Sequence, residues 1–153
     1  MIDQHQSRTL APTFTVFIVD DDDDVRVMVR GVLEEAGYRT LEAADGGTAL
    51  AMLQHYTAPL VVLLDILLPQ MDGAALLGIV ARHHQMALRN AFVLMTGKPI
   101  VAFPVLRRLA QDVGAQILPK PFDVASLLHA VAHAASTLPM NPPDDGPAPQ
   151  THP

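Results

Sequence analysis

The sequence predicts a doubly wound α/β protein, with a five-stranded parallel sheet in the order 2-1-3-4-5 and five helices. Two observations lead to this fold class. Short β-branched or apolar runs alternate along the chain with longer segments whose apolar residues recur at helical spacing. Five such alternations imply right-handed crossovers, which make the strands parallel and place helices on both faces of the sheet.

The first four elements follow from hydropathy. Residues 14–19 are aromatic and β-branched and end in acid, which predicts a strand. Apolar residues recur at helical spacing over 25–36, and Gly37 suits the position that stops a helix. Residues 38–43 resemble a second strand and 48–55 a short helix.

The remaining elements repeat this alternation. Residues 60–64 are apolar throughout, as expected for a strand covered on both faces. Residues 73–84 carry an apolar helical stripe, and 104–113 start with a proline in the first turn of a helix. Two further strands are predicted over 91–95 and 116–118, and Asp123 is predicted to cap a last helix. With the order 2-1-3-4-5, the fold is flavodoxin-like.

The composition predicts the limits of the domain and excludes some classes of partner. Residues 1–13 are polar and 138–153 are rich in proline, so we expect disordered tails around one domain over 14–137. The net charge of -6 argues against nucleic acid or an anionic membrane as a partner. There is no cysteine for disulfides or thiolate metal sites, and no apolar stretch long enough to insert into a membrane. A cytoplasmic protein is expected.

Polar residues follow the strands at the edge where such sheets bind ligands. Asp20 and Asp21 end the first strand, Asp65 the third, Thr96 the fourth and Lys120 the fifth. Since the first and third strands are neighbours in the predicted order, three carboxylates converge. Carboxylates that close repel unless one is protonated or a cation joins them. Oxygen ligands alone favour Mg²⁺.

These residue types suit phosphoryl transfer. A carboxylate can attack phosphorus and form an aspartyl phosphate. A lysine ammonium can neutralise a phosphoryl oxygen, and a threonine hydroxyl can hydrogen-bond another.

At these residues the sequence resembles the receiver domain of bacterial response regulators, over about 14–137. The strings that carry the resemblance are VFIVDDDDDVR at 16–26, LLDILLPQMDG at 63–73, VLMTG at 93–97 and LPKPF at 118–122. The resemblance implies that Asp65 is phosphorylated by a phosphohistidine of a sensor histidine kinase or a histidine phosphotransfer protein. It also implies a cis bond between Lys120 and Pro121. The implied Mg²⁺ ligands are Asp20, Asp21, Asp65 and the backbone carbonyl of Leu67, with Thr96 and Lys120 contacting the phosphoryl group.

Two features depart from the family pattern. An aromatic residue is common three positions before the lysine, where this chain has Ile117. The stretch between Thr96 and Lys120 is longer than usual. We therefore expect the phosphorylation chemistry to be kept and the output switch to be smaller or different.

Three functions remain open. The first is a stand-alone signalling module whose target is another protein, because nothing after residue 137 is long enough for an output domain. The second is a receiver that binds partners without phosphorylation. The third is an aspartate-nucleophile phosphatase, which typically carries a second acid two residues after the nucleophile. Leu67 occupies that position here, which favours a phosphoryl acceptor with at most slow self-dephosphorylation over an enzyme.

Several other motifs have simpler interpretations. Asp22 to Asp24 are typical of a solvated helix start, and Asp72 with Gly73 of a turn before a helix. Gly46 and Gly47 are interpreted as a loop without a phosphate-binding pattern. His129 and His133 have a spacing that metal sites use, but a polar helix face is the expected reading.

Overall fold

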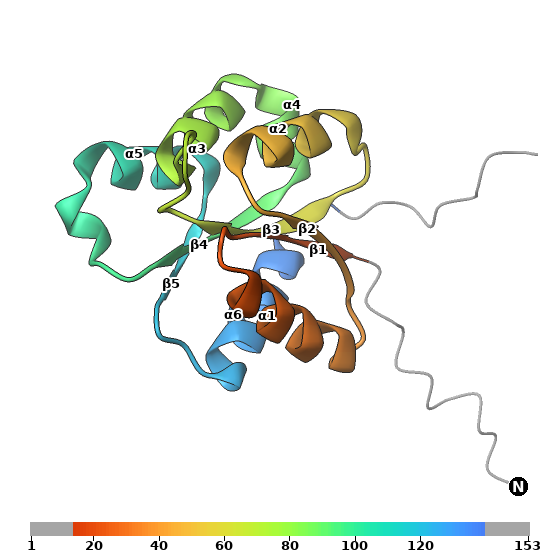
Figure 1. The fold of residues 1–153 in the computed structure, drawn as a ribbon. Coiled ribbons are helices and arrows are strands. Elements are labelled where there is room, and N and C mark those ends of the chain that lie inside the picture. Colours follow the sequence, from red (N-terminus) through yellow and green to blue (C-terminus); the bar gives the residue numbers. More distant parts are fainter. Residues whose placement is uncertain (1–13, 140–153) are drawn as a thin grey trace, which may run out of the picture.

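The computed structural model describes residues 14–139 and contains the predicted sheet. Five parallel strands lie in the order β2-β1-β3-β4-β5, which confirms the fold class (Figure 1). The strands are β1 (Thr15–Val19), β2 (Arg39–Ala43), β3 (Leu60–Asp65), β4 (Ala91–Thr96) and β5 (Gln116–Pro119). All therefore point their carboxyl ends toward the same edge.

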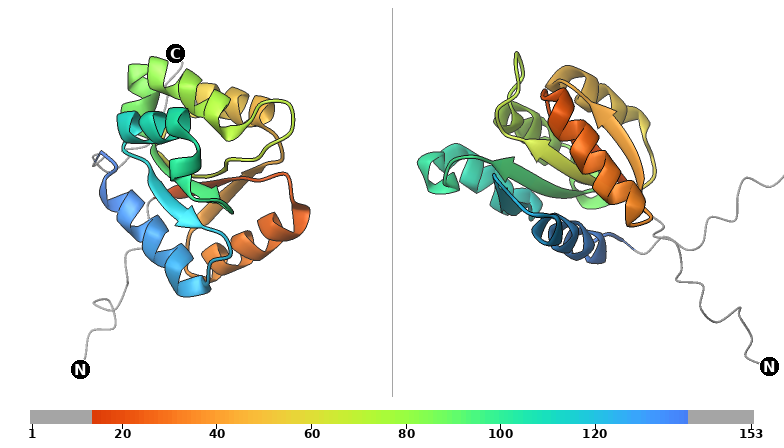
Figure 2. Two further views of the ribbon diagram at one scale, coloured as in Figure 1. Left: turned by 90° about the vertical axis from the view of Figure 1, so that its left-hand side faces the viewer. Right: turned by 60° about the horizontal axis from the view of Figure 1, so that its bottom comes forward.

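Helices cover both faces of the sheet (Figures 1 and 2). One face carries α2 (Gly46–His55), α3 (Gly73–Arg82), α4 (His84–Arg89) and α5 (Pro104–Val113). The other face carries α1 (Asp23–Glu35) and α6 (Val124–Ser136). A 3₁₀ turn, η2 (Ile100–Ala102), precedes α5.

The core consists of two apolar layers separated by the sheet. Side chains alternate between the faces of a strand, so each strand contributes to both layers. In β3, Val62 and Leu64 pack toward α2–α5, whereas Val61 and Leu63 pack toward α1 and α6. All six residues of β3 are buried, as its uninterrupted apolar run predicted.

The prediction of five helices is wrong by one, because the helical pattern after Gly73 contains a break. His83 has φ -102° and ψ 90°, so α3 ends at Arg82 and a separate six-residue helix, α4, begins at His84. Met86 is buried in the same layer as α3, which kept the apolar spacing nearly continuous across the break. Hydropathy alone therefore did not reveal the backbone turn.

Gly46 is also placed differently from the prediction. Gly46 and Gly47 are the first residues of α2 rather than a loop, and the Asp45 side chain caps this helix by accepting from the Thr48 N–H at 2.7 Å. A Cβ on Gly46 would lie 2.5 Å from the Met71 carbonyl oxygen. A residue without a side chain is therefore needed where α2 passes the segment that follows β3.

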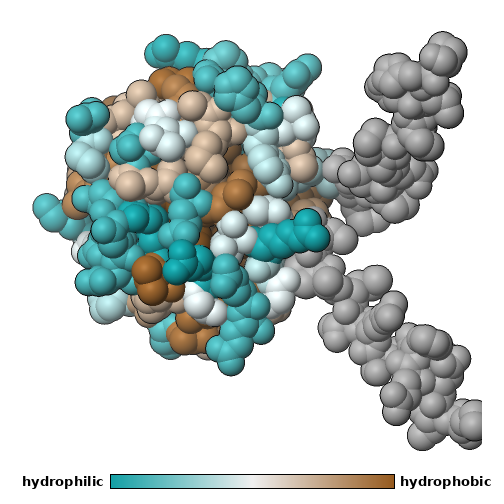
Figure 3. Space-filling view, turned by 45° about the vertical axis from the view of Figure 1, so that its right-hand side comes forward, coloured by the Kyte–Doolittle hydropathy of each residue, from teal (hydrophilic) through white to brown (hydrophobic). Residues whose placement is uncertain are grey.

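The domain extends slightly past its expected C-terminal boundary. Leu138, the first residue of the expected tail, is 6% exposed and packs in the layer of α1 and α6. Of the expected tails, residues 1–13 and 140–153 lie outside the described part. Between residues 14 and 139, the chain has no helix with the length and hydropathy needed to cross a bilayer. On the face shown in Figure 3, apolar residues form small separate areas among polar ones.

Candidate functional site

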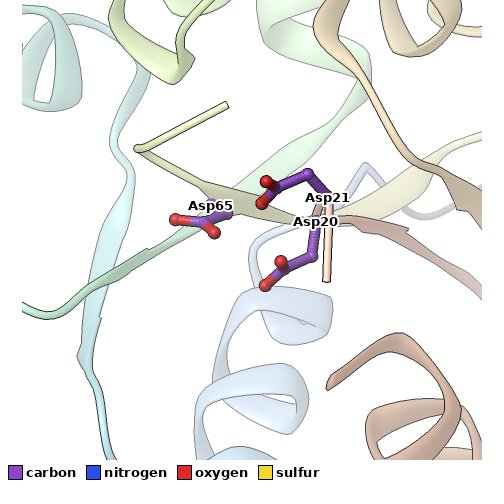
Figure 4. Close-up of side chains that lie close together, drawn as sticks. All are labelled: Asp20, Asp21 and Asp65. Carbon is purple, nitrogen blue, oxygen red and sulfur yellow. The ribbon is translucent and has the colours of Figure 1, made fainter. Parts of the chain in front are cut away.

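The predicted carboxylates converge where β1 and β3 end (Figure 4). Asp20 and Asp21 follow β1, and Asp65 is the last residue of β3. One oxygen of each of these side chains lies within 4.8 Å of the others. The register brings them together, because Val19 pairs with Leu64 and the next residues along the two strands are Asp20 and Asp65. Asp20 and Asp65 are 0% and 7% exposed, whereas Asp21 is exposed.

Asp20 is held by both its backbone and its side chain. Its N–H donates to the Ala43 carbonyl at 3.2 Å, and its own carbonyl accepts from the Arg26 guanidinium at 2.6 Å. Its carboxylate accepts from the Asp22 N–H at 3.0 Å and from the Lys120 ammonium at 2.9 Å. The buried charge of Asp20 is thereby compensated on each oxygen.

Asp65 also has one hydrogen-bond donor on each carboxylate oxygen. Its Oδ1 accepts from the Leu67 N–H at 3.1 Å, and its Oδ2 accepts from Lys120 at 3.2 Å. Burial raises the pKa of Asp65 above its usual value, and the charge of Asp20 acts in the same direction. The two donors act the opposite way without cancelling this rise.

Lys120 is the cation that faces the cluster. It follows β5, and its ammonium bridges Asp20 and Asp65. Burial works against its charge, but the hydrogen bond to Asp20 and the charges of both carboxylates outweigh burial and raise the pKa of Lys120. The bond between Lys120 and Pro121 is cis, as the resemblance implied.

Thr96 lies at the same edge but outside this cluster. Its buried hydroxyl donates to the Lys98 carbonyl at 2.6 Å and accepts from the Lys98 N–H at 3.1 Å. Strand alternation explains the difference. Met95 and Leu118 belong to the layer of α1 and α6, so Lys120, two residues after Leu118, continues that face, whereas Thr96 continues the opposite one.

The segment after Asp65 places Leu67 beside the cluster. The Leu67 N–H contacts Asp65, and its hydrocarbon side chain is 62% exposed. Gly73, at the start of α3, packs directly against the end of β3, since a Cβ there would lie 2.8 Å from the Asp65 carbonyl oxygen and 2.8 Å from the Ile66 Cα. Asp72 caps α3 by accepting from the Ala75 N–H at 2.8 Å, in agreement with its interpretation as a helix start.

Two residues that shape the site were not singled out from the sequence. Arg26 contacts the Asp20 carbonyl, and Glu42 of β2 pairs with Arg26 at 3.5 Å. Arg26 ends the string that carried the family resemblance, which was the available signal. His129 and His133 are exposed on α6, and the Nδ1 of His133 lies 2.6 Å from Gln116 Nε2.

The residues present fit a divalent cation. Three carboxylates face one ammonium group, so their negative charge exceeds the local positive charge. Two of these carboxylates are buried, where like charges repel more strongly than in water. An oxygen-only donor set of this kind suits Mg²⁺ better than a softer metal.

Comparisons with known proteins identify relatives of the chain. A family model described as the response regulator receiver domain matches residues 16–132. Sensor kinase CckA of Brucella abortus is 32% identical over 123 residues, which are 80% of this chain and 12% of that protein. Protein PilG of Pseudomonas aeruginosa is 29% identical over 128 residues, which are 82% of this chain and 91% of PilG. The chain therefore spans a small part of some curated relatives and nearly all of another.

A solved structure gives the same result for the fold. The chemotaxis protein CheY4 of Vibrio cholerae superposes with a TM-score of 0.67 at 30% identity. The match covers 79% of this chain and 98% of the CheY4 chain.

Proposed function

The chain belongs to the response regulator receiver domain family, and from this premise we propose that Asp65 is the residue on which it accepts a phosphoryl group. Members of this family are phosphoacceptor modules of two-component signalling. The observation that carries the proposal is the convergence of Asp20, Asp21 and Asp65 within 4.8 Å, with Lys120 bonded to two of them. A lone acid at a strand end would not need this surrounding charge.

The proposed donor is a phosphohistidine of a sensor histidine kinase or a phosphotransfer protein. A carboxylate oxygen of Asp65 forms a bond to phosphorus, while the bond from phosphorus to the donor imidazole breaks. The electron pair of that bond leaves with the imidazole, which departs neutral when its other nitrogen carries a proton. Because histidine kinases draw their phosphoryl group from ATP, we infer a cytoplasmic location.

Lys120 and Thr96 would contact the phosphoryl group once it is bound to Asp65. Lys120, already beside Asp65, pairs with an oxygen of the bound phosphoryl group. Thr96 donates to another oxygen after its hydroxyl leaves Lys98, so the 96–98 turn must open. That opening, in the layer of α3 and α5, is the proposed start of the change in binding surface that a downstream protein reads.

The proposed Mg²⁺ ligands are Asp20, Asp21, Asp65 and the Leu67 carbonyl. When bound, Mg²⁺ supplies positive charge to the cluster and to the oxygens of the incoming phosphoryl group. Asp20 and Asp65 supply buried oxygens, and the exposed Asp21 leaves the outer side open to water and donor.

Leu67 favours a phosphoryl acceptor over a phosphatase. Its side chain is a hydrocarbon at the position where such an enzyme needs a second acid, and it cannot activate water. We therefore infer that any self-dephosphorylation is slow.

Intact mass measurement on the full chain, incubated with acetyl phosphate, tests the proposal. The native chain should gain one phosphoryl group with Mg²⁺ and none without it, and Asp65→Asn should gain none. Asp72→Asn is the matched control, because Asp72 is an exposed acid seven residues away whose capping role asparagine can keep. Phosphorylation of Asp65→Asn would show that the acceptor is misassigned. No addition to the native chain under any condition would favour binding without phosphorylation.

A further inference from the structure

Arg26 connects the acidic cluster to the neighbouring strand. This residue of α1 is 15% exposed in its side chain, so most of its guanidinium is covered. Its three guanidinium nitrogens contact three different groups. One donates to the Asp20 carbonyl at 2.6 Å, one pairs with the Asp23 carboxylate, and Nε lies 3.5 Å from a Glu42 oxygen.

The bond to Asp20 is the one that bears on the site. Asp20 follows β1, and its peptide groups have partners on both sides, because its N–H donates to Ala43 and its carbonyl accepts from Arg26. The next residue in the chain is Asp21. The direction in which both carboxylates point therefore depends on a backbone segment that Arg26 holds in place.

We propose that Arg26 is a positioning residue for the cation site, which orients Asp20 and Asp21 through the Asp20 backbone carbonyl. The inference rests on the proposed Mg²⁺ site and adds a residue that contacts the backbone of one ligand, Asp20, rather than a carboxylate group of the site. Removing a group that hydrogen-bonds to a metal ligand and orients it typically weakens metal binding about 10- to 100-fold.

The positioning role and the positive charge of Arg26 predict opposite effects of its removal on Mg²⁺ affinity. A positive charge near a cation site weakens cation binding, so removing it should tighten the binding of Mg²⁺. Removing an orienting group should weaken it. The sign of the change in Mg²⁺ affinity therefore separates the two roles.

Arg30 provides the matched control. It lies one turn further along α1 and pairs with the same Glu42, at 2.8 Å from the other carboxylate oxygen. Among the contacts of the described residues, Arg30 reaches Glu42 and not Asp20. Arg26→Met and Arg30→Met thus remove the same charge and share one lost partner, and only the first loses the bond to Asp20.

The test is an NMR titration of the full chain with Mg²⁺ alone, for the native protein, Arg26→Met, Arg30→Met and Arg26→Lys. We expect the Kd for Mg²⁺ to rise about 10-fold in Arg26→Met and to stay equal or fall in Arg30→Met. Arg26→Lys keeps the charge but loses the three-way geometry of the guanidinium, so its Kd should also rise. Urea unfolding of each variant without Mg²⁺ shows whether the variant is folded. If Arg26→Met is not folded, the comparison of Arg26→Lys with Arg30→Met tests the proposal.

The outcomes separate this inference from the proposed function. A Kd for Arg26→Met and Arg26→Lys no higher than that of Arg30→Met would overturn the positioning role while leaving the site intact. Absence of Mg²⁺ binding in the native chain would instead overturn the proposed cation site itself, and the positioning role with it.

Discussion

Gly73→Ala should destabilise the domain at the point where α3 meets the end of β3. The added Cβ would lie 2.8 Å from the Asp65 carbonyl oxygen and from the Ile66 Cα. Both atoms belong to the backbone of β3 and the residue after it, so no side chain can rotate away. To reach the 3.4 Å of ordinary contact, α3 and β3 must separate by about 0.6 Å.

Overpacking of this kind costs about 1–3 kcal/mol, which for a domain of this size lowers the melting temperature by roughly 3–6 °C per kcal/mol. Urea unfolding followed by circular dichroism measures the change. The control is Gly31→Ala, because Gly31 is exposed within α1 and a Cβ there meets nothing within 4 Å. That variant should gain roughly 0.5–1 kcal/mol from helix propensity.

The displacement should also reach the site, since the clash is with the Asp65 peptide itself. Gly73→Ala should therefore bind Mg²⁺ more weakly than Gly31→Ala in the same titration. If Gly73→Ala proved as stable as the native chain while Gly31→Ala gained stability as expected, the close approach would not constrain the fold, and the reasoning would be refuted.

Three further outcomes depend on charge. Without Mg²⁺, Asp65→Asn should raise the melting temperature at pH 7. Burial and the charge of Asp20 raise the pKa of Asp65, so the folded protein loses stability as the pH rises from 3.8 to that pKa and does not regain it above. An unchanged or lower melting temperature would contradict this. Lys120→Met should lower the free energy of unfolding by about 1–3 kcal/mol at pH 7. Because the pKa of Lys120 is raised in the fold, the stabilisation by its charge is complete below pH 10.5 and is lost as the pH rises through the folded pKa. A loss of stability that does not change between pH 8 and 11 would exclude the ion pair as its cause. Asp123→Ala should lower the urea midpoint at neutral pH, and the difference from the native chain should shrink as the pH falls below 3.8. The hydrogen bonds from Ser126 lower the pKa of this cap, so its charge-dependent contribution is lost as the pH falls through that pKa. A difference that does not change with pH would point to packing instead.

The sequence predicted the acidic cluster because the cluster depends on strand ends, which hydropathy reveals. Buried parallel strands are short apolar runs, and the first polar residue after each run marks the edge of the sheet. Asp20 and Asp65 follow paired residues of β1 and β3, so a correct strand order was sufficient to bring them together. Lys120 joins them because it follows β5 on the same face.

The features that the sequence did not predict depend on partners rather than on periodicity. The hydroxyl of Thr96 is bound by Lys98, two residues away, and only the backbone of that turn decides this. Arg26 lies in the acid-rich start of α1, and its bond to the Asp20 carbonyl depends on how α1 docks against the sheet. The break at His83 leaves the apolar spacing almost unchanged.

The sheet divides the side chains of the site between its two faces. Asp20, Asp65 and Lys120 continue the face packed by α1 and α6, whereas Thr96 continues the face packed by α3 and α5. Substitutions on the outer surfaces of α3 and α5 leave the residues of the charged cluster in place when they spare Gly73, which packs against the Asp65 carbonyl, and the turn at Thr96. A protein engineer could therefore change which partner docks on α3 and α5 while keeping these two contact points and the charged cluster as they are.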